Sequence, residues 1–207
     1  MSKALALLAA VLAVSLVAVA AASPQGATPP VTTIRILSFE FVGQFLNSPP
    51  GVTPATHDHY GYLSYASGLR AFGGVPEDEA TALFTFYANA RTLRVISDGP
   101  MRIITRVGRL TIYQDPSSNG SFSDPGTFSD GAPVLVARFR QQVVFDTVSN
   151  TFTTFHRNRI TSTKPFGVGA KRVQFGVVGA TFTTEFTGHA NMPGSPSGYF
   201  GGFAGTR

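Results

Sequence analysis

The chain has 207 residues and a formal net charge of +5, with 18 Phe, 22 Gly, 14 Pro and neither Cys nor Trp. The missing Cys excludes disulfides, thiol nucleophiles and Cys-ligated metals. Charged residues make up only 13% of the chain. The basic residues are scattered rather than gathered in one basic run, so we expect no binding to nucleic acid.

The first 22 residues have the pattern of a secretory signal peptide. Lys3 supplies the positive start, residues 4–19 form an uncharged apolar run, and Ala20 and Ala22 offer the small residues that a signal peptidase needs. The run is shorter than the roughly 20 residues of a membrane span. We therefore expect a secreted protein, extracellular or periplasmic, with no membrane span in the mature chain. A retained N-terminal anchor is the alternative.

After a Pro-rich linker, the composition becomes typical of β-structure. Phe, Val, Thr, Ile and Tyr dominate, which favours pleated strands. Gly, Pro, Asn, Asp and Ser separate the apolar runs as turn residues do, and no stretch of 12 or more residues has helical periodicity. The sequence predicts strands over 32–46, 58–72, 79–90, 92–98, 101–114, 132–146, 151–163 and 172–189, and allows a short ninth strand over 198–204.

Long strands joined by short turns favour an all-β fold, a single antiparallel β-barrel of about eight strands. A two-sheet β-sandwich is the alternative. The loop over 115–131 is long enough to act as a lid or binding loop. The expected division of the chain is a signal peptide over 1–22, a Pro-rich linker over 23–31, a β-barrel domain over 32–190 and a Gly-rich C-terminal tail over 191–207.

The hairpin over 132–163 can be aligned residue by residue. A four-residue loop over 147–150 pairs Asp146 with Thr151. One face is then apolar at both ends and is expected to face the core. Its cross-strand pairs are Phe145 with Phe152, Val143 with Thr154, Gln141 with His156, Phe139 with Asn158 and Ala137 with Ile160.

Gln141, His156 and Asn158 are polar side chains on this apolar face. Buried polar groups need hydrogen-bond partners, so these either satisfy one another or hold a water, or they line a pocket and orient a ligand. We predict that Phe139, Gln141, His156 and Asn158 bind a small, mostly apolar molecule in the barrel interior, without a cofactor or a metal ion. Whether the protein is an enzyme stays open.

In the enzymatic alternative, a cofactor-free cyclase or isomerase uses the same pocket. His156 is then the candidate catalytic acid or base, since histidine titrates near neutrality. The sequence contains no G-x-S-x-G nucleophile elbow. It also contains neither a P-loop nor an H-E-x-x-H motif.

The opposite face of the hairpin places Arg138 against Arg159 and Arg140 against Arg157. Like charges at this distance are mildly destabilising on their own. Either carboxylates from a neighbouring strand interleave with them, or solvent screens them, or an anionic polymer binds there. The last option suits a third class, a structural or surface-interaction protein with a filled core.

His57, Asp58 and His59 form the only short cluster of metal-ligand types. His57 and His59 share a face on an extended strand, so two imidazoles and a carboxylate are a weak zinc candidate, with His156 or His189 as a distant extra ligand. The segment follows a Pro-rich loop, so we expect these residues to be solvated.

Overall fold

The computed structural model describes residues 33–169, 171–191 and 197–206. The expected signal peptide over 1–22 and the expected linker over 23–31 lie outside these ranges. The described chain is almost entirely strands, with one 3-10 helix, η1 (Pro125–Phe128). Within the described ranges, no helix has the length and apolar character needed to cross a membrane.

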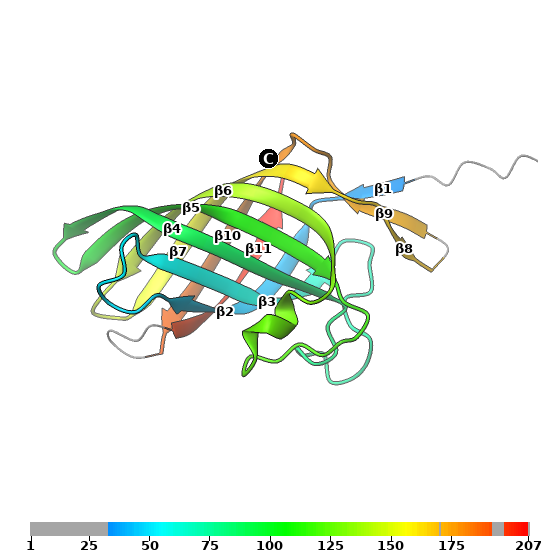
Figure 1. The fold of residues 1–207 in the computed structure, drawn as a ribbon, viewed down its shortest axis with the longest axis horizontal. Helices are drawn as coiled ribbons and strands as arrows, with labels where there is room; N and C mark the ends of the chain where they lie inside the picture. Colours follow the sequence, from blue (N-terminus) through cyan, green and yellow to red (C-terminus); the bar gives the residue numbers. More distant parts are fainter. Residues whose placement is uncertain (1–32, 170, 192–196, 207) are drawn as a thin grey trace, which may run out of the picture. The chain divides into compact units, whose positions relative to one another are not determined.

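Eight antiparallel strands form a closed barrel (Figure 1). This confirms the predicted barrel over the sandwich. Neighbours around the barrel follow chain order, and the last strand closes the wall against the first. The strands are β2 (Phe39–Asn47), β3 (Thr56–Ala66), β4 (Phe84–Asp98), β5 (Met101–Gln114), β6 (Ala132–Asp146), β7 (Thr151–Thr163), β10 (Thr181–Ala190) and β11 (Ser197–Gly205).

Several strands differ from the predicted elements. The strand expected over 32–46 is divided into β1 (Thr33–Ile36) and β2, the strand expected over 58–72 ends at Ala66, and the strand expected over 172–189 is divided into β9 (Lys171–Phe175) and β10. The strands expected over 79–90 and 92–98 are joined in the single long strand β4, whose register shifts between Thr92 and Arg94. The short ninth strand corresponds to β11, which pairs with both β10 and β2. The barrel wall therefore extends past residue 190, into the segment expected to be a Gly-rich tail.

A small three-stranded sheet packs against one end of the barrel. It consists of β1 (Thr33–Ile36), β8 (Phe166–Val168) and β9 (Lys171–Phe175), with β1 and β9 parallel. Phe175 is fully buried, and its ring centroid lies 6.0 Å from those of Phe39 and Phe84. Because the side chains of this sheet join the main hydrophobic cluster, this end of the barrel is filled with apolar groups.

Inward-facing glycines lie opposite phenylalanines of the neighbouring strands around the barrel wall. Each of five such glycines lies directly across from a Phe on the neighbouring strand. A Cβ added to the glycine would overlap atoms of that Phe. The pairs are Gly43–Phe200, Gly108–Phe139, Gly188–Phe152, Gly198–Phe45 and Gly202–Phe186. An aromatic ring covering a cross-strand glycine restores the packing that the glycine lacks. The pairing therefore fits many large rings inside a narrow barrel.

The loop over 115–131 lies against the outer face of the wall. Its Phe122 and Phe128 pack on each other, with ring centroids 5.0 Å apart, and Phe128 packs on Tyr60 of β3 at 5.7 Å. Tyr60 is thereby buried although it points away from the interior. No residue of this loop lines the interior cavity described below, so the structure does not support its suggested role as a lid over that cavity.

Candidate functional site

The predicted register of the β6–β7 hairpin is confirmed. Asp146 pairs with Thr151, and the pairs that follow are those expected, as far as Ala137 with Ile160. The apolar face turns inward, and all four predicted ligand-binding residues on it are buried: Phe139, Gln141, His156 and Asn158. The four-residue loop and the alternation of side chains were sufficient to predict this part of the interior.

The predicted site residues lie next to one another but at different depths. The His156 ring stacks on Phe139, with centroids 4.3 Å apart and planes 3° from parallel. The Asn158 side-chain amide donates to the Phe182 carbonyl oxygen at 3.3 Å. Of the four residues, only Gln141 lines the main interior cavity. Phe139 and Asn158 therefore belong to the packed core beside the cavity.

These polar side chains do not satisfy one another. Both polar atoms of Gln141, Nε2 of His156 and Oδ1 of Asn158 are buried without a hydrogen-bond partner in the described protein. A buried polar atom without a partner costs about 1–3 kcal/mol. The expectation that these side chains satisfy one another is thus wrong for Gln141, while a bound water or a ligand remains as the predicted partner. A ligand or a water molecule would supply partners to these atoms.

A cavity of about 180 Å³ lies at the end of the barrel opposite the small sheet. Here the β4–β5 and β6–β7 hairpins turn (Figure 1). Aromatic and aliphatic side chains form much of its wall: Phe45, Ile104, Val143, Phe145, Phe152 and Ala190. Its polar lining is Asn47, His57, His59, Arg106, Gln141 and Thr154. An apolar chamber with a few convergent polar groups is typical of small-molecule sites.

His57 and His59 are part of this interior, so the expectation that they are solvated is wrong. They are 5% and 3% exposed, and their Nε2 atoms lie 2.6 Å apart. The Nδ1 atom of His57 hydrogen-bonds to the Asn47 side-chain oxygen. Among the described residues, no group of three or more His, Asp or Glu is arranged to hold a metal ion.

The three interior histidines are held in their neutral form. Burial lowers the pKa of His57 and His59 well below the ordinary 6.5, and the neighbouring histidines, followed by Arg106, lower it further. Burial, followed by Arg106, lowers the pKa of His156 to about 3. At neutral pH these rings therefore bring hydrogen-bonding nitrogens to the interior but no charge.

Arg106 is a buried cation that the sequence reasoning missed. It is 8% exposed, and its Nε–H donates to Thr92 Oγ1 at 3.4 Å. Burial lowers its pKa to about 10, so it remains charged at neutral pH. The alternation along β5 could have revealed it, because Arg106 shares the inward face with Ile104, Leu110 and Ile112.

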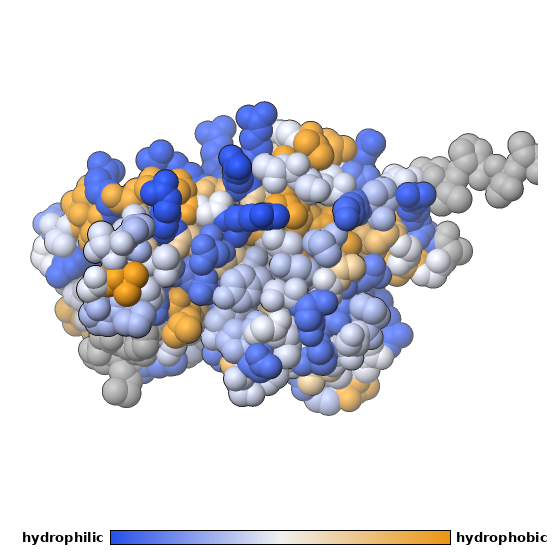
Figure 2. Space-filling view, in the orientation of Figure 1, coloured by the Kyte–Doolittle hydropathy of each residue, from blue (hydrophilic) through white to orange (hydrophobic). Residues whose placement is uncertain are grey.

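The outer face of four neighbouring strands carries a second positive region, which we call the arginine wall. Its exposed members are Arg91 and Arg94 on β4, Arg109 on β5, Arg138 and Arg140 on β6, and Arg157 and Arg159 on β7. Hydrophilic side chains project from this part of the barrel in the space-filling view (Figure 2). No member forms an ion pair with another described residue. Interleaved carboxylates, one expected explanation, are therefore wrong for this part of the chain.

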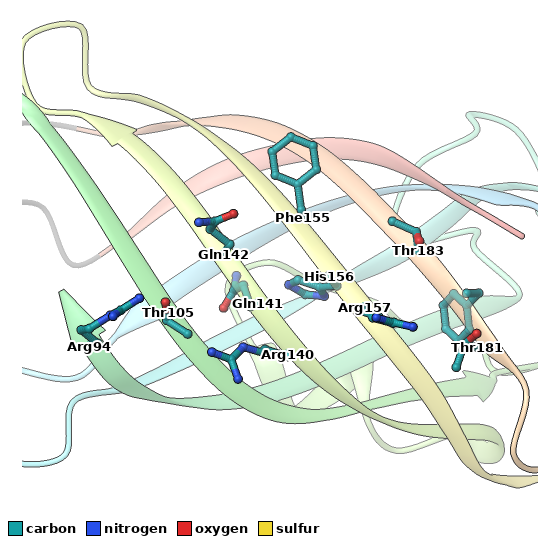
Figure 3. A pocket seen from close by; sticks show the side chains of 11 residues that line it. Arg94, Thr105, Arg140, Gln141, Gln142, Phe155, His156, Arg157, Thr181 and Thr183 are labelled. Carbon is teal, nitrogen blue, oxygen red and sulfur yellow. The ribbon is translucent and has the colours of Figure 1, made fainter. Parts of the chain in front are cut away.

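The arginine wall is organised in rows across the sheet. Arg109, Arg138 and Arg159 are cross-strand neighbours, and Arg140 and Arg157 form the next row. A pocket of about 710 Å³ lies beside them. Figure 3 shows that Arg94, Arg140 and Arg157 line it from three strands, together with the buried Gln141 and His156. The wall thus presents rows of exposed arginine side chains to solvent.

Comparison of the chain with known protein families, with curated proteins and with solved structures returns no match.

Proposed function

We propose that this is a secreted binding protein whose barrel interior takes up a small, mostly apolar molecule. The observation that carries the proposal is the 180 Å³ cavity, with largely apolar walls and an unpartnered Gln141 side chain on its lining. A dry protein cavity of about 150 Å³ is sufficient to bind benzene. The expected ligand is thus a single-ring or short-chain molecule with one or two polar atoms.

Filling the cavity tests this proposal. Val143 lines the cavity, whereas Val144, the next residue, points to the outer face. Val143→Phe should abolish binding of small aromatic molecules, measured by NMR titration, while Val144→Phe should leave it unchanged. Undiminished binding in the folded Val143→Phe variant would refute an interior site. Native mass spectrometry of protein secreted by its own host would identify a copurifying molecule.

The same ligand would distinguish a binding protein from a cofactor-free cyclase or isomerase. His156→Ala removes the candidate catalytic group, which lies beside the cavity rather than on its main lining. Loss of turnover with intact binding would favour the enzyme. Binding of an unchanged molecule by the wild type would favour the binding protein.

A second candidate function rests on the arginine wall. We propose that it binds a linear acidic polysaccharide, because its guanidinium rows have no carboxylate partner among the described residues and arginine forks match carboxylate and sulfate oxygens. Retention on immobilised heparin should weaken as salt rises, since salt screens exposed charges. Replacing Arg138, Arg140, Arg157 and Arg159 by Gln should abolish retention. Retention that survives these changes would contradict a site on this wall.

A further inference from the structure

The interior cavity contains a full positive charge without a counter-charge. Arg106 lines the cavity and is 8% exposed. No Asp or Glu lines this cavity, and the residues outside the described ranges contain no Asp or Glu side chain. The guanidinium therefore has no carboxylate side chain as a partner in the cavity, either within the described structure or from the rest of the chain.

This arrangement is unusual for a buried arginine. Buried charges are ordinarily paired, because removing an ion from water is costly unless an opposite charge compensates it. A guanidinium also has five N–H donors in a planar fork. Within the described protein only the Nε–H of Arg106 meets an acceptor, the Thr92 hydroxyl. The remaining donors are available to a molecule in the cavity.

The surrounding groups fit an anion better than a second cation or a neutral solute. His57 and His59 lie on the same lining and are uncharged at neutral pH, so they add hydrogen-bonding nitrogens without positive charge. Gln141, directly across from Arg106 on β6, has an amide NH₂ with no partner. Two adjacent donor groups thus converge on the same part of the cavity.

We propose that Arg106 binds the carboxylate of a small organic acid, with the Gln141 amide as a second donor. This deepens the proposed interior binding function and rests on it. The apolar part of the acid lies against Phe45, Val143 and Phe152, which line the same cavity. One cationic side chain matches one anionic group, and a volume of about 180 Å³ limits the ligand to an aromatic or short-chain monocarboxylate.

Calorimetric titrations at pH 7 with three probes test the assignment: benzoate, uncharged benzyl alcohol and inorganic phosphate. Wild type is compared with Arg106→Leu and with Arg35→Leu, a change at an exposed position on β1, outside both the cavity and the arginine wall. Benzoate should bind the wild type at least tenfold more tightly than benzyl alcohol does. Arg106→Leu should lose at least tenfold in benzoate affinity, about 1.4 kcal/mol, while Arg35→Leu should lose none.

Benzyl alcohol also verifies that Arg106→Leu remains folded, because its binding should persist in that variant. Replacing a buried unpaired charge by an apolar side chain is often stabilising, so the ligand-free variant should melt no lower than the wild type. Equal affinity for benzoate in wild type and Arg106→Leu would overturn the inference and leave the interior site standing. Phosphate as the only probe that binds would also overturn it. Failure of every aromatic probe would refute the interior site itself, and the inference with it.

Discussion

Lowering the pH from 7 to 5 should destabilise the folded barrel, because His57, His59 and His156 stay neutral inside it. In the unfolded chain each imidazole has a pKa near 6.5 and takes up a proton in this range. The folded pKa values are lower, and that of His156 is about 3. The unfolded state therefore binds more protons, so stability is fully present above pH 6.5 and is lost as the pH falls toward 3.

The magnitude can be worked out for His156 alone. Each pH unit between the unfolded and folded pKa values costs about 1.4 kcal/mol per group. From pH 7 to pH 5 the loss from His156 is therefore about 2 kcal/mol. His57 and His59 act in the same direction. Since a typical domain has only about 5–15 kcal/mol of stability, the effect should be large.

Urea unfolding curves at pH 5 and pH 7 measure this effect. His156→Phe keeps an aromatic ring against Phe139 but cannot take up a proton. The free energy of unfolding of this variant should fall by about 2 kcal/mol less than that of the wild type between the two pH values. Gln141→Leu, a buried change without a titrating group, should show the wild-type pH dependence. An equal fall in wild type and His156→Phe would refute the assignment of His156 as a buried neutral base.

Three further predictions concern the barrel wall. Gly188→Ala should lower the free energy of unfolding by about 1–3 kcal/mol through overpacking, because its Cβ would overlap the Phe152 ring. Gly201→Ala, at an open outward position of the same sheet, should leave the free energy of unfolding unchanged in the same urea assay. Phe175→Ala should destabilise the folded barrel by about 3–5 kcal/mol, since the ring is fully buried between the small sheet and the barrel. A loss of stability below about 1 kcal/mol would contradict that packing. Arg157→Glu, opposite Arg140, should stabilise by about 0.2–1 kcal/mol, a gain that should vanish in 1 M salt.

The sequence was sufficient to predict the barrel and its best-defined hairpin. Strict alternation and a four-residue loop leave one register for β6 and β7, because a one-residue slip exchanges the inward and outward sets. The sequence alone therefore places Gln141, His156 and Asn158 inside the barrel. Their lack of partners could not be predicted, since it depends on the side chains of β5 and β10.

The predictions that the structure contradicts have physical causes. The Gly-rich segment of β11 resembles a loose tail when it is considered alone, and its glycines make sense only beside Phe45 and Phe186 on the neighbouring strands. His57 follows a Pro-rich loop, so local composition indicated exposure to solvent, whereas His57 shares the inward face of β3 with His59 and Leu63. Arg106 was missed because many neighbouring arginines point outward. The alternation of side chains along β5 nevertheless places it on the inward face.

Closure of the barrel joins strands that are far apart along the chain. β2 lies near the start of the described sequence, and β11, which completes the wall against it, lies near the end. Contacts of such long sequence separation form slowly, because the intervening chain must be ordered before they contribute. Until then, β2 and β10 are open edges that can pair with other chains. Folding of this protein should therefore be sensitive to concentration, and a chain that stops before Ser197 should aggregate rather than form a smaller barrel.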